Sequence, residues 1–387
     1  MRHTDVERYG RASTDDLRIA IVHDFMETYG GAERVTAEIA AALPQARVYA
    51  IVGRRSVAER MGVAGRFRSL MRASEPLLAN YRRLAPVYPA LLDRVELPAA
   101  DVLVTSSYAF AHRLRTVNRA PHLCYLHSPL RFAWSMTDSY RKVWAGGSVR
   151  DAAFDALARR MRESDRRAAR RVDRFVTQSP YVADQIERFY GCGAEAIGAP
   201  VDCDAFRPSG RAPEDFFLFC GRLIEPYKKV SIVLEAFARL PHERLVVAGD
   251  GPAAAELRRR ATPNVEFVGH AGDAAVVDLM QRAKATVFPS QDDFGLVPVE
   301  AMACGRPVIA YAGGGALHTV RDGVTGMHFA EQTADCLTAA LRAFDPGAYE
   351  AEAIRRHALQ WDRPAFRERI VEEVARLAAR GRVGAAA

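Results

Sequence analysis

Apolar runs of strand length alternate with helical stretches along most of this chain. The first run, LRIAIVHDF at 17–25, is followed by YGGAERVTAEIAAAL, in which a glycine pair opens a helical pattern. Three later runs have the same strand character: ADVLVTSS at 100–107, HLCYLHSP at 122–129 and RFVTQSP at 174–180. Strands that are separated by helical stretches predict a parallel sheet with right-handed crossovers.

A second set of alternating runs follows residues 198–215, which are rich in Pro, Gly and Asp and predict a linker. The strand runs beyond it are FFLFCGRL (216–223), RLVVAGDG (244–251), VEFVGH (265–270), ATVFPS (285–290) and RPVIAYAGGG (306–315). Two such sets predict an α/β protein with two doubly wound Rossmann-like domains that face each other across a cleft. Ligands of these sheets bind at the C-terminal ends of the strands, so the cleft is the expected site.

The domain boundaries follow from this division. We expect a polar tail at 1–15, an N-terminal domain at 16–199 and a C-terminal domain at 200–361. The last helical stretch, 362–387, is expected to pack back on the N-terminal domain. A chain of 387 residues supplies two domains of ordinary size with ample core.

The composition narrows the class of protein. There is no run of about 18 apolar residues, and the N-terminus lacks an apolar secretory segment, so a cytoplasmic protein is expected. The net charge of +7 leaves three kinds of partner open: nucleic acid, an anionic membrane face and an anionic small substrate. No basic motif with interleaved aromatic residues supports nucleic acid, and the arginine-rich stretch 159–174 also fits a solvated helix face.

The stretch QDDFGLVPVEAMACGRP at 291–307 contains acidic residues at the junction between a predicted strand and a predicted helix. Asp292 and Asp293 follow the strand run, Gly295 comes next, and Glu300 lies in the helical part. Backbone N–H groups at the start of a helix have no intrahelical acceptor and are suited to bind phosphate. The groups concerned belong to Phe294, Gly295, Leu296 and Val297. The acids can then accept hydrogen bonds from the hydroxyl groups of a sugar.

Two cations at the end of another predicted strand complement this element. Arg222 follows the strand directly and Lys228 lies in the loop beyond it, in a chain with only four lysines. A planar guanidinium and a compact ammonium together suit a diphosphate. Two solvated loop cations are the alternative interpretation.

The segment AGDGPAAAEL at 248–257 matches the pattern G-x-G-x-x-A after a strand. This pattern is a weak signature of dinucleotide binding. A plain tight turn between a strand and a helix explains the same glycines.

Taken together, GRLIEPYKK, AGDGP, VEFVGHAGD and FPSQDDFGLVPVEAMACGRPVIA resemble the signatures of glycosyltransferase family 4, the retaining nucleotide-sugar transferases of the GT-B fold. The order and spacing agree from about residue 20 to the C-terminus. LHSPLRFAWS and DDFGLVPVEA are most similar to the mannosyltransferase branch that builds bacterial O-antigen and exopolysaccharide. The resemblance implies that the C-terminal domain binds the donor and the N-terminal domain the acceptor.

The resemblance also implies roles for individual residues. The implied catalytic residues are His127, Arg222, Lys228 and Asp292, with the two cations on the departing diphosphate, His127 and Asp292 on the sugar, and Glu300 on the ribose. The glycine pair Gly30–Gly31 is expected in a loop over the donor phosphates or the acceptor. Further implied contacts are Gly221, Gly269, His270 and Asp293. The chain departs from the family pattern at Asp292 and at His318, because relatives carry Glu at these positions.

The expected reaction is transfer of a hexose, with GDP-mannose as the expected donor, to a hydroxyl of a glycan or a polyprenyl-lipid acceptor, with retention. The cations are expected to replace a metal ion, so neither a metal nor a further cofactor is predicted. Two alternatives remain open: a catalytically silent binding subunit on the GT-B scaffold, and a GT-B epimerase or phosphorylase.

Arginines alternate with large apolar residues in 53–72 and 77–92. An amphipathic basic surface of this kind is typical of peripheral contact with an anionic membrane. Ordinary core helices with their arginines in water are the alternative.

Overall fold

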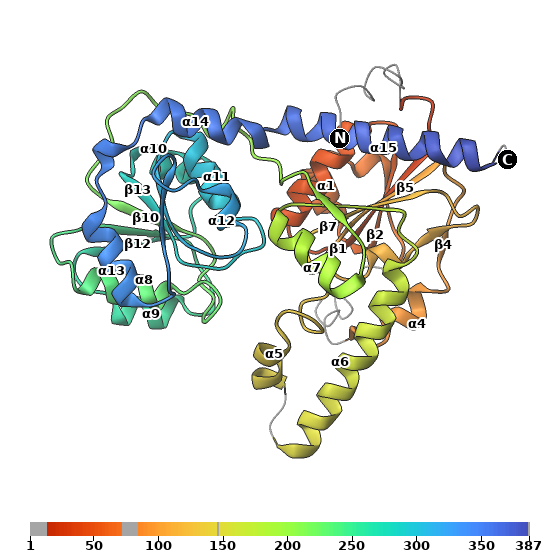
Figure 1. Ribbon diagram of the computed structural model, residues 1–387, viewed down its shortest axis with the longest axis horizontal. Helices are drawn as coiled ribbons and strands as arrows, with labels where there is room; N and C mark the ends of the chain where they lie inside the picture. The colour runs from red at the N-terminus through yellow and green to blue at the C-terminus, as the bar shows by residue number, and fades with distance from the viewer. Residues whose placement is uncertain (1–13, 72–83, 145–146, 386–387) are drawn as a thin grey trace. The chain divides into compact units, whose positions relative to one another are not determined.

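The computed structural model describes residues 14–71, 84–144 and 147–385 (Figure 1). The chain divides into two compact units, one formed by the residues up to Ile197 and from Phe366 onward, the other by Gly198–Ala365. Residues 1–13 of the expected tail, and 77–83 of one basic stretch, lie outside the described residues. No helix in the described ranges has the length and apolar character that a membrane span needs.

The N-terminal unit contains a seven-stranded parallel sheet in the order β3-β2-β1-β5-β7-β8-β9. Its strands are β1 (Ile19–Met26), β2 (Arg47–Gly53), β3 (Phe67–Ser69), β5 (Val102–Ser107), β7 (His122–Leu126), β8 (Arg174–Thr177) and β9 (Ala194–Ala196). The strand order reverses between β1 and β5, which makes this sheet doubly wound with a switch point there.

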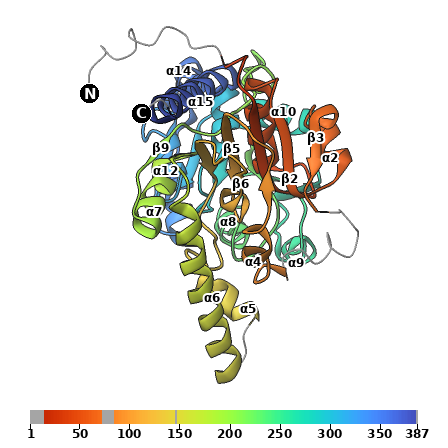
Figure 2. The ribbon, with the colours of Figure 1, turned by 90° about the vertical axis from the view of Figure 1, so that its right-hand side faces the viewer.

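Helices and short elements complete the N-terminal unit. They are α1 (Gly31–Ala42), α2 (Arg55–Arg60), η1 (Ala64–Arg66), α4 (Tyr88–Leu92), η3 (Ala111–Arg113), α5 (Thr137–Trp144), α6 (Ser148–Ala169), α7 (Pro180–Tyr190), α15 (Arg363–Ala385) and the small strand pair β4 (Glu96–Leu97) and β6 (Arg115–Thr116). The N-terminal part of α6 runs away from the sheet, with α5 alongside it (Figure 2).

The C-terminal unit contains a six-stranded parallel sheet in the order β12-β11-β10-β13-β14-β15. The strands are β10 (Phe217–Cys220), β11 (Leu245–Ala248), β12 (Val265–Gly269), β13 (Ala285–Phe288), β14 (Val308–Tyr311) and β15 (Gly326–Phe329). The helical elements are α8 (Val230–Ala238), α9 (Ala254–Arg260), α10 (Asp273–Arg282), α11 (Leu296–Ala303), α12 (Ala316–Thr319), α13 (Ala334–Ala343), η4 (Pro346–Ala348), α14 (Ala351–Ala358) and η5 (Leu359–Trp361).

The central strands are continuous apolar runs because both of their faces are covered. All eight residues of β1 and all six of β5 are buried, as are all four of β11 and β13. The predicted class, an α/β fold with two Rossmann-like units, is confirmed. The sequence analysis did not identify β2, β3, β9 or β15; β9 has only three residues, all half-buried, and therefore carries no apolar pattern.

The expected linker begins with a fixed segment. The Val201 N–H donates to the Trp361 carbonyl over 2.8 Å, and the Arg363 N–H donates to the Val201 carbonyl over 3.2 Å. The chain entering the C-terminal unit is therefore paired with the chain leaving it. Beyond Phe366, α15 packs on the N-terminal unit, where Arg367 pairs with Glu38 at 2.6 Å.

A buried carboxylate organises the loop that follows β5. Asp24, in β1, is fully buried, and its two oxygens accept the backbone N–H groups of four consecutive residues, 108–111, over 2.6–2.8 Å. Hydrogen bonds from N–H groups to an ionised acceptor are stronger than neutral ones. The last of these residues, Ala111, begins η3, so one side chain from β1 fixes both the turn after β5 and the start of the next helix.

We expect Asp24→Ala to lower the free energy of unfolding of the N-terminal unit by about 3–5 kcal/mol, because four buried N–H groups lose their acceptor. Urea unfolding followed by tryptophan fluorescence in a Trp361→Phe background, which removes the tryptophan of the C-terminal unit, measures the change. Asp173→Ala is the matched control, since Asp173 is exposed and accepts one backbone N–H, from His122. Equal stability of the two variants would show that the Asp24 contacts contribute little.

Candidate functional site

The C-terminal ends of β10 and β13 lie next to each other in the second sheet. The loop after β10 holds the predicted cations, and the loop after β13 holds the predicted acids. Arg222 is exposed, and within the described residues its guanidinium has no hydrogen bond or ion pair. Lys228 reaches across to the neighbouring loop, where its ammonium lies 2.5 Å from an oxygen of Asp292.

The pair of Lys228 and Asp292 is largely shielded from water. The two side chains are 18% and 19% exposed. The ammonium contacts Oδ2 of Asp292, while Oδ1 is buried and has no hydrogen-bond partner in the described part of the chain. A buried oxygen without a donor is uncommon in proteins and is suited to accept from a bound ligand. The sequence analysis assigned the two side chains to different parts of a donor, and the structure joins them in one ion pair.

The start of α11 has the predicted phosphate-binding geometry. Gly295 caps the helix with φ at 87°, a left-handed conformation that suits glycine. In the described part of the chain no acceptor faces the N–H groups at this helix start, which belong to Phe294, Gly295, Leu296 and Val297. Such groups carry the partial positive charge of the helix dipole. Glu300 is a buried residue further along the same helix.

Three consecutive glycines, which the sequence analysis placed at the end of a strand run, pack against this loop. The segment Gly313–Gly315 precedes α12, and the Gly315 N–H donates to the Asp292 carbonyl over 2.8 Å. A Cβ on Gly315 would lie 2.3 Å from the Cα of Phe294, and one on Gly314 would lie 2.4 Å from the Asp292 carbonyl oxygen. The GGG sequence was the available signal. His318 is exposed on α12, and no contact within the described residues indicates its role.

Packing explains the glycines of AGDGP. A Cβ on Gly249 would lie 1.9 Å from the carbonyl oxygen of Gly221, and a Cβ on Gly251 would lie 2.4 Å from that of Leu223. The turn after β11 therefore needs glycine in order to approach the loop after β10. This finding favours the tight-turn interpretation over a dinucleotide site.

Two predicted contacts lie apart from the rest. Gly269 ends β12 and accepts the Gly249 N–H over 2.7 Å, and the exposed His270 follows it. The strand β12 is three positions away from β13 in the sheet, or about 14 Å at ordinary strand spacing. The structure therefore does not bring these two residues together with Asp292.

The N-terminal unit has its own polar cluster at the ends of β1, β5 and β7. His127 directly follows β7 and is 6% exposed, and its Nε2 lies 2.8 Å from the hydroxyl of Ser106. Burial is the main cause that holds the pKa of His127 well below its ordinary value, and the nearby His23 and Arg131 lower it further. The imidazole is therefore neutral at neutral pH.

The glycine pair opens α1 beside this cluster. Gly30 caps the helix, and its N–H donates to Oε2 of Glu33 over 2.9 Å. The other carboxylate oxygen of Glu33 lies 3.5 Å from Nε2 of His23. Gly31 is the first helical residue and is exposed. The pair thus belongs to a capped helix start, and a loop over the donor stays a prediction.

Sequence reasoning missed His23, Thr36 and Ser106, which are all fully buried. Thr36, on α1, lies 2.9 Å from Nδ1 of His23 and 2.7 Å from the hydroxyl of Ser106. The available signal was the presence of polar residues in otherwise apolar strand runs, in IVHDF and VTSS.

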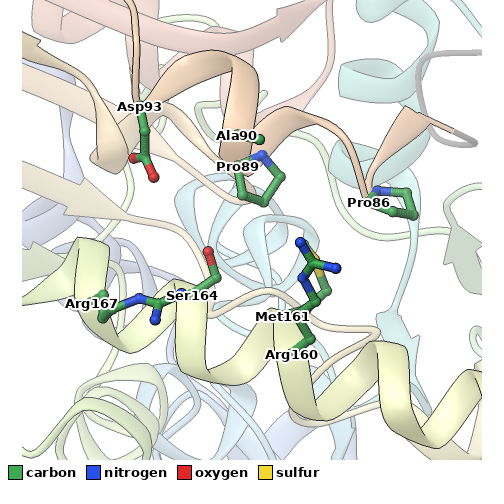
Figure 3. Close-up of a pocket in the computed structure, with 8 residues that line it drawn as sticks. All are labelled: Pro86, Pro89, Ala90, Asp93, Arg160, Met161, Ser164 and Arg167. Atoms are coloured by element: carbon green, nitrogen blue, oxygen red, sulfur yellow. The ribbon is translucent and has the colours of Figure 1, made fainter.

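A cavity of about 200 Å³ lies between α4 and α6 (Figure 3). Its wall combines apolar side chains with arginines: Pro86, Pro89, Ala90, Asp93, Arg160, Met161, Ser164 and Arg167. In the described ranges Arg160 and Arg167 have no ion-pair partner, and Leu84, Val87 and Leu91 are exposed nearby in the chain segment that contains α4. This surface therefore pairs uncompensated cations with exposed apolar side chains.

One basic residue of the stretch 53–72 has a different role. The Arg66 guanidinium donates to the carbonyls of Ala40, Leu43 and Ala46, and so caps the end of α1. Burial lowers its pKa from the ordinary value. This cation is therefore part of the fold of the N-terminal unit.

Comparisons with known proteins agree with the two units. Glycosyltransferase Family 4 matches residues 29–205, and Glycosyl transferases group 1 matches residues 214–344. The chain is 38% identical over 196 residues to D-inositol 3-phosphate glycosyltransferase of Mycobacterium avium, which covers 43% of this chain and 46% of that protein. The Mycobacterium tuberculosis protein of the same name is 34% identical over 220 residues, covering 48% and 45%. The chain thus spans about half the length of these curated relatives.

Solved structures show the same fold. HepE of Anabaena, in complex with UDP, has a TM-score of 0.69 at 19% identity and covers 92% of this chain and 99% of its own. Sucrose-phosphate synthase of Thermosynechococcus elongatus has a TM-score of 0.66 at 19% identity, covering 94% and 100%. The predicted GT-B fold is confirmed.

We expect Gly315→Ala to displace the loop at 292–294, because its new Cβ would meet the backbone of Phe294 while its own φ of −68° suits alanine. The variant should lower the melting temperature and weaken nucleotide binding at least tenfold, the scale of an overpacked contact. Calorimetry and titration with UDP and GDP measure both. Gly272→Ala is the control, since Gly272 also has φ at −68° and a Cβ there meets nothing within 4 Å. Normal nucleotide affinity in Gly315→Ala would contradict the supporting role.

Proposed function

We propose that this chain, which consists of a family 4 glycosyltransferase domain followed by a group 1 glycosyl transferase domain, transfers a hexose from a nucleoside diphosphate sugar to an acceptor hydroxyl with retention. One observation carries the proposal. A helix start with four N–H groups that have no acceptor in the described part of the chain adjoins a loop with an uncompensated arginine and a lysine. This combination suits a diphosphate, whose oxygens need several donors at once.

The same groups would lower the barrier for leaving-group departure. Negative charge grows on the diphosphate as the glycosidic bond breaks, and preorganised donors stabilise it more than they stabilise the intact donor. Lys228 is balanced by Asp292 in the structure, so an incoming phosphate would compete for an ammonium that is already held in place. Arg222 would add a planar pair of donors. The proposed chemistry needs no metal ion and no further cofactor.

The acids would orient the donor. In the described residues, Oδ1 of Asp292 is buried and has no hydrogen-bond partner, so it is suited to accept a hydrogen bond from a hydroxyl of the sugar. Glu300 lies about one turn into the helix and would accept from the ribose hydroxyls. Asp293 is half-buried between Asp292 and the helix start and would take part in sugar binding. His127 would supply a neutral ring nitrogen to the sugar from the N-terminal unit.

The donor and acceptor are proposed from the family resemblance. GDP-mannose is the proposed donor because LHSPLRFAWS and DDFGLVPVEA are most similar to the mannosyltransferase branch. UDP-sugars are the competing class, since HepE was solved with UDP and with UDP-glucose. A glycan or polyprenyl-lipid hydroxyl is the proposed acceptor, and the relatives that are named D-inositol 3-phosphate glycosyltransferases add inositol phosphate as a candidate to test.

A lipid acceptor would place the protein at the inner face of a membrane. The surface formed by α4, α6 and the cavity between them supports this proposal (Figure 3). Its uncompensated Arg160 and Arg167 would contact anionic headgroups, and the exposed Val87 and Leu91 would enter the interface.

A donor screen tests the function. GDP-mannose, UDP-glucose and a dTDP-sugar are compared by thermal shift, because ligand at one hundred times its Kd stabilises by about 2.7 kcal/mol. Release of nucleotide with each candidate acceptor separates a transferase from a silent binding subunit, which would bind without turnover. Nucleotide release that needs no acceptor and leaves an epimerised or phosphorolysed sugar would support the other alternative.

We expect Arg222→Ala and Lys228→Ala each to lower kcat/KM by about a hundredfold to a thousandfold, the scale of losing a preorganised donor to the leaving group. Arg239→Ala is the control, since Arg239 lies at the opposite end of α8 and pairs with Asp335 on the surface. Turnover close to that of the unmodified protein in both site variants would remove the phosphate assignment.

We expect the protein to sediment with vesicles that contain anionic lipid at low salt and to be released at high salt. Arg160→Ala combined with Arg167→Ala should weaken binding about thirtyfold, at about 1 kcal/mol for each cation near the surface. Val87→Asp should also weaken it, whereas Val324→Asp, an exposed valine of the C-terminal unit, should not. Absence of binding at low salt would rule out the membrane proposal without affecting the transferase proposal.

A further inference from the structure

Two polar networks occupy opposite faces of the N-terminal sheet at the ends of β1 and β5. Neighbouring residues of a strand point to opposite faces, so His23 and Ser106 share one face while Asp24 and Ser107 share the other. The Asp24 side fixes the loop after β5, as described above. The His23 side contacts α1 through Thr36 and Glu33, and it ends at His127, a residue of the proposed active site.

His127 uses one ring nitrogen inside the protein. Its Nε2 lies 2.8 Å from the hydroxyl of Ser106, which itself is fully buried. Its Nδ1 has no hydrogen-bond partner in the described part of the chain, and it is not one of the buried polar atoms that lack a partner. Nδ1 is therefore accessible from outside. The ring of Tyr125 lies 5.0 Å away at 60°, which further restricts rotation of the imidazole. Nδ1 is therefore the nitrogen that a ligand can reach.

Ser106 is held from behind by two further side chains. Its hydroxyl lies 2.7 Å from that of Thr36, and its carbonyl oxygen lies 3.0 Å from Nδ1 of His23. A carbonyl oxygen can only accept, so His23 carries a proton on Nδ1. Nδ1 of His23 also lies 2.9 Å from the Thr36 hydroxyl, which can donate a hydrogen bond either to the Ala32 carbonyl, 2.9 Å away, or to the hydroxyl of Ser106.

This arrangement leaves the Ser106 hydroxyl free to rotate between two states. In one state it donates to Nε2 of His127 and accepts from Thr36. In the other it accepts from Nε2 and donates to Thr36, whose proton then goes to the Ala32 carbonyl. The hydroxyl groups of Ser106 and Thr36 are satisfied in both states, so Nδ1 of His127 can either donate to or accept from a ligand. Nε2 of His23 is buried, has no hydrogen-bond partner in the described residues and lies 3.5 Å from a carboxylate oxygen of Glu33.

We propose that Ser106, supported by Thr36 and His23, is a positioning residue that anchors His127 through Nε2 and presents Nδ1 to a hydroxyl of the substrate. The inference rests on the proposed function for the identity of the substrate, and on the contacts alone for the anchoring. Glu33 extends the chain, since it contacts His23 and the cap of α1 at the glycine pair. The glycine pair, the helix start and the active-site histidine thus belong to one connected set of contacts.

Nitrogen NMR of ¹⁵N-histidine-labelled protein without any substrate tests the anchoring, with the His127 signals assigned through His127→Gln. Ser106→Ala should change the signals of both ring nitrogens, because Nε2 loses its partner, and Ser106→Thr should restore them. Thr36→Val should shift them in the same direction and Thr36→Ser should not, so a second pair of variants remains if Ser106→Ala does not fold. Unchanged His127 signals in both Ser106→Ala and Thr36→Val would overturn the proposal.

Kinetics test the consequence. Ser106→Ala should lower kcat about tenfold to a hundredfold at a nearly constant KM for the donor. This is the scale known for metal-binding histidines that lose the hydrogen-bond partner that orients the ring. Ser106→Thr should recover turnover. NMR changes in Ser106→Ala with unaltered kcat would overturn the positioning role. A protein that shows the NMR changes but releases no nucleotide with any donor would contradict the proposed function and leave the anchoring in place.

Discussion

The N-terminal unit depends on a buried carboxylate near the C-terminal end of the central apolar strand β1. Asp24 is fully buried, and the N–H groups of residues 108–111 converge on its two oxygens. A buried charge is costly unless it is fully hydrogen-bonded, and here consecutive backbone groups supply the bonds. Ser107, the last residue of β5, contacts His112 in η3, and His112 in turn contacts Asp165 on α6. Burial alone would raise the pKa of Asp165, but contacts from His112, Tyr190 and Trp134 lower it.

This constraint explains how the C-terminal ends of two central strands, β1 and β5, can hold polar residues on both faces of the sheet. On one face, Asp24 and Ser107 fix the loop after β5 and connect it to α6. On the other face, the same strand ends carry His23 and Ser106. His23 contacts Ser106, and Ser106 contacts His127. Because the loop is already fixed by Asp24, the second face is available for His127, the histidine that we propose faces the ligand. Stability and site geometry are therefore carried by neighbouring residues of the same two strands.

In the C-terminal unit, the loops at the strand ends are positioned by glycine residues rather than by a buried charge. Two pairs of turns approach each other closely at the strand ends, those after β10 and β11 and those after β13 and β14. Gly249 in the first pair, and Gly314 and Gly315 in the second, leave no Cβ between the backbones. The turns then hold the start of α11 and the loop of Lys228 side by side. The ion pair between Lys228 and Asp292 connects the two loops, so the cation that would bind a phosphate is already oriented.

The sequence by itself determined the fold class, the strand-end location of the cations and acids, and the glycine start of α11, because apolar periodicity and local turn chemistry are written in consecutive residues. It did not reveal β9 or the partnership of His127, since a three-residue strand has no period and a hydrogen-bond partner such as Ser106 lies 21 residues away. The separation of Gly269 and His270 from Asp292 was also beyond it, because strand order in a sheet is set by packing between distant segments. Only the tertiary structure determined which polar side chains share a face of the sheet, because it brought His23, Thr36 and Ser106 from separate elements into contact with one another and with His127.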